Sequence, residues 1–151
     1  MPKRSAGILM FRRRGAGLEV LLVHPGGPFW ARKDDGAWSI PKGEYTQEYP
    51  LACALREFEE ELGIRPEGEA VPLGEIRQKG GKLVTGFAMA GDFDPAAFVS
   101  NTFEMEWPPR SGKVQSFPEI DRVQWFSADE ARVRINTAQA ALIDRLIQVV
   151  T

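Results

Sequence analysis

The sequence predicts an α/β protein of the α+β type, with more strands than helices, and three observations support this prediction. Short apolar runs bounded by glycine or proline recur along the chain, which is typical of strands. Two segments, 50–62 and 137–149, instead space their apolar residues with the period of a helix. The chain has 151 residues, 43% hydrophobic and 26% charged, which is typical of one globular domain spanning residues 1–151.

The expected elements follow from these runs and from their boundaries. Gly80 and Gly81 predict the turn of a hairpin between two strands, and Ser127 to Glu130 has the capping-box pattern that begins a helix. A single helical turn is expected within 94–100. The segment 107–119 is expected to be a long irregular loop, a kind of loop that often carries function. The expected strands are 5–12, 18–24, 38–40, 71–78, 82–90, 102–106 and 122–126.

Composition excludes several kinds of protein. With Cys53 as the single cysteine and His24 as the single histidine, any metal must be bound by oxygen ligands. A net charge of −2 argues against a general nucleic-acid binder but allows a small basic pocket for one phosphorylated molecule. No apolar run approaches the roughly 18 residues of a membrane span, and the N-terminal run is too short for a signal peptide. A cytoplasmic location is therefore the default expectation.

The predicted helix 50–62 has one apolar face and one acidic face. The acidic face carries Glu57, Glu60 and Glu61. A solvated surface is the plain alternative, but like charges four residues apart, and acids in the last helical turn, each cost a few tenths of a kcal/mol or more, roughly 0.2–1 kcal/mol. A divalent cation would turn these costs into binding energy, and carboxylates suit Mg²⁺ or Mn²⁺. The apolar face is formed by Leu51, Ala54, Leu55, Phe58 and Leu62.

Residues 43–64 closely resemble the Nudix box, Gly-x5-Glu-x7-Arg-Glu-U-x-Glu-Glu-x-Gly-U, where U is a bulky aliphatic or similar residue and Phe58 takes the first U position. The match is in register from Glu48 to Ile64, but only four residues separate Gly43 from Glu48, one fewer than in the family. The preceding segment 38–43 is similar to the strand that leads into the box. The segments 123–127 and 129–131 resemble the family's last strand and its C-terminal helix.

This resemblance implies a Nudix fold, in which a mixed β-sheet lies between helices, and a set of site residues. Glu57, Glu60 and Glu61 would bind Mg²⁺ or Mn²⁺, and Gly43 would offer its backbone carbonyl. Arg56 would belong to the catalytic set with the three glutamates, and Glu48 would pair with Arg56 to hold the loop against the helix. The family hydrolyses a nucleoside diphosphate linked to another group X by attack of water on phosphorus, assisted by metal ions.

Several residues outside the helix are candidates for contacts with substrate. Phosphates can be bound by Lys42, Arg110 and Lys113, and nucleobases can stack on Trp30 and Trp107, although surface solubility and packing are equally good explanations. The motif does not fix the general base. Its candidates are Glu104, Glu106 and Glu119, which flank the long loop, with a solvated surface role as the alternative.

The substrate class expected from the resemblance is a small phosphorylated nucleotide. The sequence leading into the box favours dinucleoside polyphosphates, with nucleoside triphosphates next; ADP-ribose and capped RNA 5′ ends stay open. The alternatives are a non-catalytic Nudix-like nucleotide-binding module and a structural domain whose acidic helix is only surface. No membrane partner is expected, and both a monomer and a homodimer are compatible with the sequence.

Overall fold

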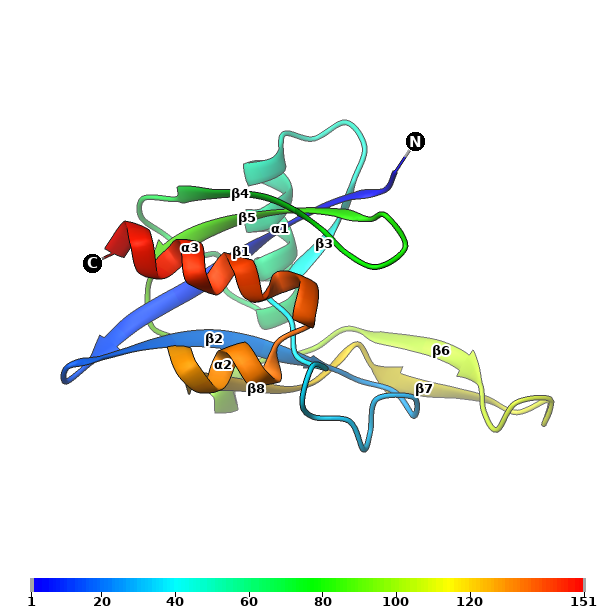
Figure 1. The fold of residues 1–151 in the computed structure, drawn as a ribbon. Helices are drawn as coiled ribbons and strands as arrows, with labels where there is room; N and C mark the ends of the chain where they lie inside the picture. Colours follow the sequence, from blue (N-terminus) through cyan, green and yellow to red (C-terminus); the bar gives the residue numbers. More distant parts are fainter. Residues whose placement is uncertain (1, 151) are drawn as a thin grey trace.

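A computed structural model describes residues 2–150 and shows the predicted mixture of strands and helices (Figure 1). The helices are α1 (Pro50–Leu62), α2 (Ala128–Arg134) and α3 (Ala140–Val150), with short 3-10 turns η1 (Pro95–Ala97) and η2 (Thr137–Gln139). The strands are β1 (Arg4–Arg14), β2 (Gly17–Pro25), β3 (Lys42–Tyr45), β4 (Val71–Arg77), β5 (Leu83–Ala90), β6 (Thr102–Glu106), β7 (Val114–Pro118) and β8 (Ile120–Ser127). Within residues 2–150, none of the helices is long and apolar enough to cross a bilayer.

The main sheet is mixed and is organised around β1. Its order is β4-β5-β1-β2-β8; β1 runs parallel to β5, and the other neighbours are antiparallel. The first residues of β1, 4–7, also pair with β3, whereas residues 11–14 pair with β2. The long strand β1 therefore holds β3, which begins the predicted box, beside α1.

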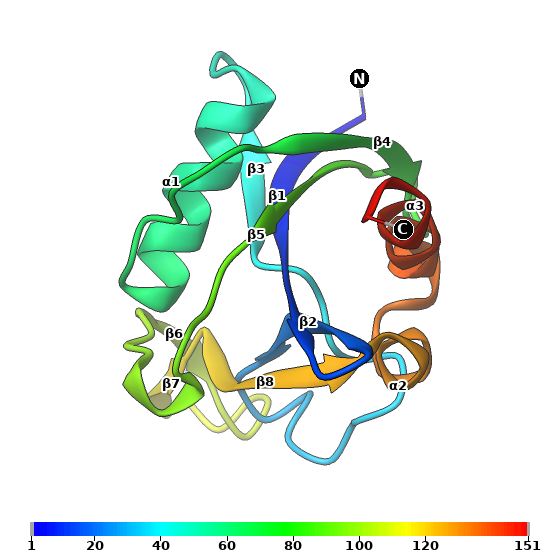
Figure 2. The same cartoon turned by 90° about the vertical axis from the view of Figure 1, so that its left-hand side faces the viewer.

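Helices cover both faces of this sheet, as the resemblance predicts. Figure 2 shows α1 on one side of β1 and β5, and α2 and α3 on the other side. Alternate residues of β1 contribute to two cores: Ile8 and Met10 pack on the α1 side, and Leu9 packs on the α3 side. Both faces of the strand are buried, which explains why β1 and β2 have continuous apolar runs in place of polar alternation.

The structure corrects three expectations about individual elements. Residues 107–119 are not a continuous loop, because β7 lies within them and forms a separate two-stranded sheet with β6. The expected strand 38–40 is replaced by two isolated bridges, Trp38 with Ile135 and Ser39 with Val23. The strand expected to lead into the box over 38–43 is β3 at residues 42–45, which begins later and extends into the box. The single helical turn expected within 94–100 is present as η1.

Candidate active site

Helix α1 displays its acidic residues because its two ends and its buried face are fixed. Pro50 occupies the first turn, where its missing N–H costs nothing, and Gly63 ends the helix in the left-handed conformation with φ 87°. The Gly63 N–H donates to the Glu59 carbonyl at 2.8 Å. The side chains packed into the core are Cys53, Ala54, Phe58 and Leu62, which leaves Glu57, Glu60 and Glu61 off the buried stripe.

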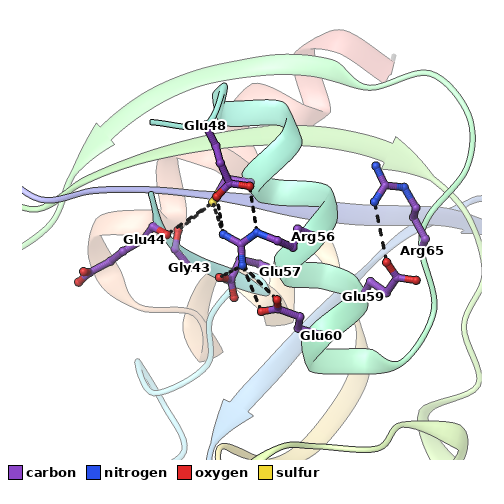
Figure 3. A network of polar contacts seen from close by, with 9 residues as sticks. Gly43, Glu44, Glu48, Arg56, Glu57, Glu59, Glu60 and Arg65 are labelled. Atoms are coloured by element: carbon purple, nitrogen blue, oxygen red, sulfur yellow. Dashed lines mark hydrogen bonds and ion pairs between the residues drawn. The ribbon is translucent and has the colours of Figure 1, made fainter. Parts of the chain in front are cut away.

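Arg56 joins the loop before α1 to the acidic face of the helix (Figure 3). Its Nε and Nη2 donate to the two carboxylate oxygens of Glu48 at 2.9 and 2.5 Å. Its Nη1 donates to Glu57 at 3.0 Å and to Glu60 at 3.1 Å. The hydrogen bonds to Glu48 raise the pKa of Arg56, and the same contact lowers the pKa of Glu48. This bidentate pair holds Glu48 against the helix, so the shortened loop stays in contact with α1.

Gly43 approaches α1 so closely that no other residue fits there without a shift. A Cβ atom at this position would overlap the carboxyl group of Glu57. The Gly43 carbonyl oxygen lies 3.3 Å from Sγ of Cys53, whose thiol is buried and donates to it. Burial raises the pKa of this thiol, which keeps the S–H proton in place. Despite the missing residue, the loop therefore brings the Gly43 backbone and the Glu57 carboxyl group together.

Glu61 carries a shielded oxygen that nothing in the described chain satisfies. Its Oε2 is excluded from solvent and has no hydrogen-bond partner among residues 2–150. Burial, and then the nearby charge of Glu57, raise the pKa of Glu61 well above its usual value. Burial and the charge of Glu60 also raise the pKa of Glu57. A buried carboxylate without a partner is costly, and a cation is the natural partner for such a group.

These observations test the fit of a divalent cation. Glu61 with its unpartnered oxygen, and Glu57 beside Gly43, fit an all-oxygen site for Mg²⁺ or Mn²⁺. Glu60 is engaged by Arg56 and its side chain is 47% exposed. Among residues 2–150, no group of three or more acids, histidines or cysteines is arranged to hold a metal ion. The carboxyl groups of α1 therefore do not converge on one point while Arg56 occupies Glu60.

Two adjoining cavities share Lys42 in their linings, and Glu61 lines the first of them. One, of about 170 Å³, is lined by Lys42, Glu61 and Glu119. The other, of about 180 Å³, is lined by side chains that include Trp30, Gln78, Asn136 and Gln139. Both cavities are bordered by Pro25, Ser39 and Lys42, so they form one groove with Lys42 at its middle. Burial lowers the pKa of Lys42.

The structure brings only some of the other predicted residues to this groove. Of the candidate bases, Glu119 lines the cavity of Glu61, whereas Glu104 and Glu106 lie exposed on β6. Figure 1 shows β6 and β7 projecting from the main sheet, and their connecting turn carries Arg110 and Lys113 at the far end. Trp107 packs edge-to-face against Phe29, with 5.3 Å between the ring centroids. This contact corresponds to loop anchoring, the alternative to base stacking considered for Trp107.

Sequence reasoning missed several residues that border the site. Gln78, Asn136 and Gln139 are distant in sequence from the box and belong to no motif in it. The contact between Cys53 and the Gly43 carbonyl was also missed, although the helical position of Cys53 on the acidic side of α1 was a signal for it. The amide side chains had no such signal, because only the fold brings the end of β4 next to η2.

Comparisons with known proteins agree with this geometry. A model of the NUDIX domain family matches residues 1–146. The fold is similar to that of the NUDIX domain of Shewanella oneidensis NrtR complexed with ADP ribose, at 17% identity and TM-score 0.67, covering 100% of this chain and 90% of that one. No match was found among curated protein sequences.

Two further solved structures have the same fold. One is a C. elegans Ap4A hydrolase in a binary complex, at 20% identity and TM-score 0.62, covering 97% of this chain and 96% of that one. The other is a NUDIX hydrolase from Nitrosomonas europaea, at 19% identity and TM-score 0.62, covering 99% and 90%. At these identities the likeness shows the shared fold.

The chain belongs to the NUDIX domain family, because the family match spans nearly its whole length. Its class is thereby that of the phosphoanhydride hydrolases, and the box on β3, the following loop and α1 is the part of the chain that defines this class.

Proposed function

We propose that this protein is a Mg²⁺- or Mn²⁺-dependent pyrophosphohydrolase that cleaves a phosphoanhydride bond in a nucleoside diphosphate linked to X. Dinucleoside polyphosphates and nucleoside triphosphates are the first candidate substrates. The observation that carries the proposal is the shielded, unpartnered oxygen of Glu61 beside Glu57 and Gly43, in a helix that matches the box in register. The ADP ribose complexed with one protein of similar fold, and the Ap4A hydrolase activity named for another, support a nucleotide substrate.

In this proposal each residue of the box has a defined task. Glu57, Glu61 and the Gly43 carbonyl would hold the cation, and Glu60 would join them if released from its hydrogen bonds with Arg56. Arg56 and Glu48 keep the loop and the helix in register through their paired hydrogen bonds. When bound, the cation neutralises phosphate charge and lowers the pKa of a water molecule.

Two residues of the groove complete the proposed chemistry. Glu119 shares the cavity with Glu61, which makes it the preferred acceptor for the proton of the attacking water among the three candidate glutamates. Lys42 lies between the two cavities and would contact the phosphates there. Trp30 offers apolar surface at the far end of the groove, where a nucleobase would lie.

The decisive experiment is a hydrolysis screen with Mg²⁺ and Mn²⁺. The panel contains nucleoside triphosphates, dinucleoside polyphosphates, ADP-ribose and capped RNA 5′ ends, read out by phosphate or nucleotide release. We expect turnover of at least one class, abolished by EDTA. Binding of nucleotides without turnover under either metal would favour a non-catalytic Nudix-like binding module.

A matched pair of variants separates the proposed site from an acidic surface. Glu60→Gln should lower activity by orders of magnitude while the fold stays intact. Glu59→Gln removes the same charge from the same helix, but Glu59 pairs with Arg65, away from Arg56 (Figure 3), and this variant should retain activity. Equal activity of both variants and the wild type would indicate that the acidic helix is surface. Size-exclusion chromatography decides between monomer and homodimer, and a cytoplasmic location stays a prediction.

A further inference from the structure

The cavity on the far side of Lys42 has a polar wall whose hydrogen-bonding direction is fixed by the backbone. It has a volume of about 180 Å³ and lies next to the cavity of Glu61. Three amide side chains, Gln78, Asn136 and Gln139, line it together with Trp30. An amide can present either an oxygen acceptor or an NH₂ donor, so its neighbours decide what a ligand would meet.

The first chain of hydrogen bonds starts at a backbone N–H that can only donate. The Ile40 N–H donates to Oε1 of Gln139 at 3.1 Å, which fixes the orientation of this buried amide. Nε2 of Gln139 then donates to Oγ of Ser39 at 3.0 Å and to Oε1 of Gln78 at 3.1 Å. The oxygen of Gln78 is thus used, and its NH₂ group has no partner among residues 2–150.

The second chain is shorter and ends in the same way. The backbone N–H of Ala138 donates to Oδ1 of Asn136 at 3.0 Å, which caps η2. Because the Ala138 N–H can only donate, its partner must be the amide oxygen of Asn136. The NH₂ group of Asn136 is therefore the half of the amide that is free to contact a ligand. It too has no hydrogen-bond partner within the part of the chain that the structure describes. Two amide groups of the cavity wall are therefore both committed to act as donors.

We infer that this cavity is a nucleobase subsite that selects keto bases, guanine and uracil or thymine, over the amino bases adenine and cytosine. This inference rests on the proposed function, which places a nucleotide in the groove. The outer edge of guanine offers O6 and N7 as acceptors and that of uracil offers O4, whereas adenine and cytosine place an amino donor there. An amino group of a base placed against these donors would leave polar groups unpaired inside the complex, which is what makes such sites selective. Gln78 and Asn136 are half-buried, so a bound base would complete their shielding from water.

The position of the cavity agrees with this assignment. Lys42 at the boundary would contact the phosphates, and Glu61 and Glu119 lie beyond it. A base in the second cavity would then leave the phosphoanhydride next to the acidic residues. The side chain of Trp30 borders the cavity and supplies the apolar surface on which a flat base can pack.

The test on the unmodified protein compares bases within each size class. We expect kcat/KM for GTP to exceed that for ATP, and that for UTP to exceed that for CTP, each by about tenfold or more. Methylene-bridged, non-hydrolysable GTP and ATP, titrated by calorimetry, should show the same order in Kd. Equal values for the members of each pair, or a preference for the amino bases, would overturn the inference.

Two variants replace the free NH₂ donor of an amide by a carboxylate oxygen, an acceptor, and keep the hydrogen bonds inside the protein. In Asn136→Asp and Gln78→Glu, one oxygen still accepts from Ala138 or Gln139, and the other becomes an acceptor that faces the cavity. Either variant should lower the ratio of GTP to ATP by about tenfold. The added charge repels all phosphates equally, so the ratio is measured and not the absolute rate. Gln148→Glu on α3 is the exposed, charge-matched control and should leave the ratio unchanged.

The outcomes separate this inference from the proposed function. If all nucleotides are hydrolysed at equal rates, the pyrophosphohydrolase stands and the keto-base subsite is wrong. If none is hydrolysed but the methylene-bridged analogues bind with the expected order, the subsite stands and the catalytic proposal is wrong. A ratio that stays unchanged in both Asn136→Asp and Gln78→Glu also contradicts the subsite.

Discussion

The contact between Gly43 and Glu57 shows how one residue can decide a site. A side chain of any size at position 43 would displace the Glu57 carboxyl group, although β3 itself tolerates other residues. We expect Gly43→Ala to lower kcat by at least tenfold with little loss of secondary structure, because the Glu57 carboxyl group must move. Steady-state kinetics and circular dichroism check this. Gly17→Ala in β2, where a Cβ has ordinary room, is the control.

Glu61 predicts a pH dependence of stability in the metal-free protein. Its folded-state pKa lies well above the usual 4.5, so the folded protein binds this proton more tightly than the unfolded chain. The stabilisation is complete below about pH 4.5 and is lost as the pH rises through the folded-state pKa. With EDTA present, Glu61→Gln should lose that decline and should be at least as stable as the wild type at neutral pH.

Urea unfolding of the wild type and Glu61→Gln across this pH range measures the difference directly. Groups far from Glu61 are common to both proteins and cancel, and Lys42 and Glu57, which interact with its charge, contribute the remaining difference. Parallel pH profiles of the two proteins would show that Glu61 is solvated and not shielded.

For single residues, the sequence predicts which side chains belong to the site better than it predicts which of them touch. The register of Glu48, Arg56 and the three glutamates of α1 was readable because the box spacing fixes it, and Arg56 does pair with Glu48. The thiol of Cys53 on the Gly43 carbonyl and the amide chain through Gln139 were not readable. Both depend on residues that only the fold brings together.

Among the elements, α1 is the one whose ends are most clearly defined by sequence. Gly63 adopts φ 87°, a conformation that costs other residues about 1–2 kcal/mol. We expect Gly63→Ala to lower the free energy of unfolding by about 1 kcal/mol, measured by urea denaturation, since its Cβ has open space and only the backbone is strained. Gly63→Asn should cost less, because asparagine tolerates this conformation. A neutral effect of alanine would contradict the left-handed cap.

The elements that were mispredicted share a physical cause. β7 is exposed on most of its length, and its apolar residues Val114 and Phe117 do not alternate, so only its pairing with β6 makes it a strand. β3 contains Lys42, Gly43 and Glu44, residues with weak strand preference, and exists because the first part of β1 offers it a partner. Trp38 and Ile40 are apolar and buried, but Trp38 and Ser39 pair with two different segments, so residues 38–40 form isolated bridges and not a strand.

At the scale of the whole molecule, the main sheet has a hydrophobic core on each face, and both cores should contribute to stability. Ile8 and Leu9 are adjacent in β1, fully buried, and face α1 and α3 respectively. Ile8→Ala and Leu9→Ala should each lower the free energy of unfolding by about 2–5 kcal/mol. Chemical denaturation measures both. A sheet with one solvated face would leave one of the two changes nearly neutral.

The architecture was predictable as a class because the box identifies a family whose fold is shared at low sequence identity. The projecting arm of β6 and β7 was not predictable from that class or from periodicity. Arg110 and Lys113 lie in the segment that connects the two strands of this arm and do not line the groove, so their contact with phosphate stays a prediction.

The most direct test of the central claim is a calorimetric titration of Mn²⁺, with nucleotide present, into the wild type, Glu61→Gln and Glu59→Gln. The account predicts saturable binding to the wild type and to Glu59→Gln, and binding weakened by at least tenfold in Glu61→Gln. Flat traces for the wild type, or equal affinities for all three proteins, would contradict the claim that the shielded carboxylate of α1 serves a divalent cation.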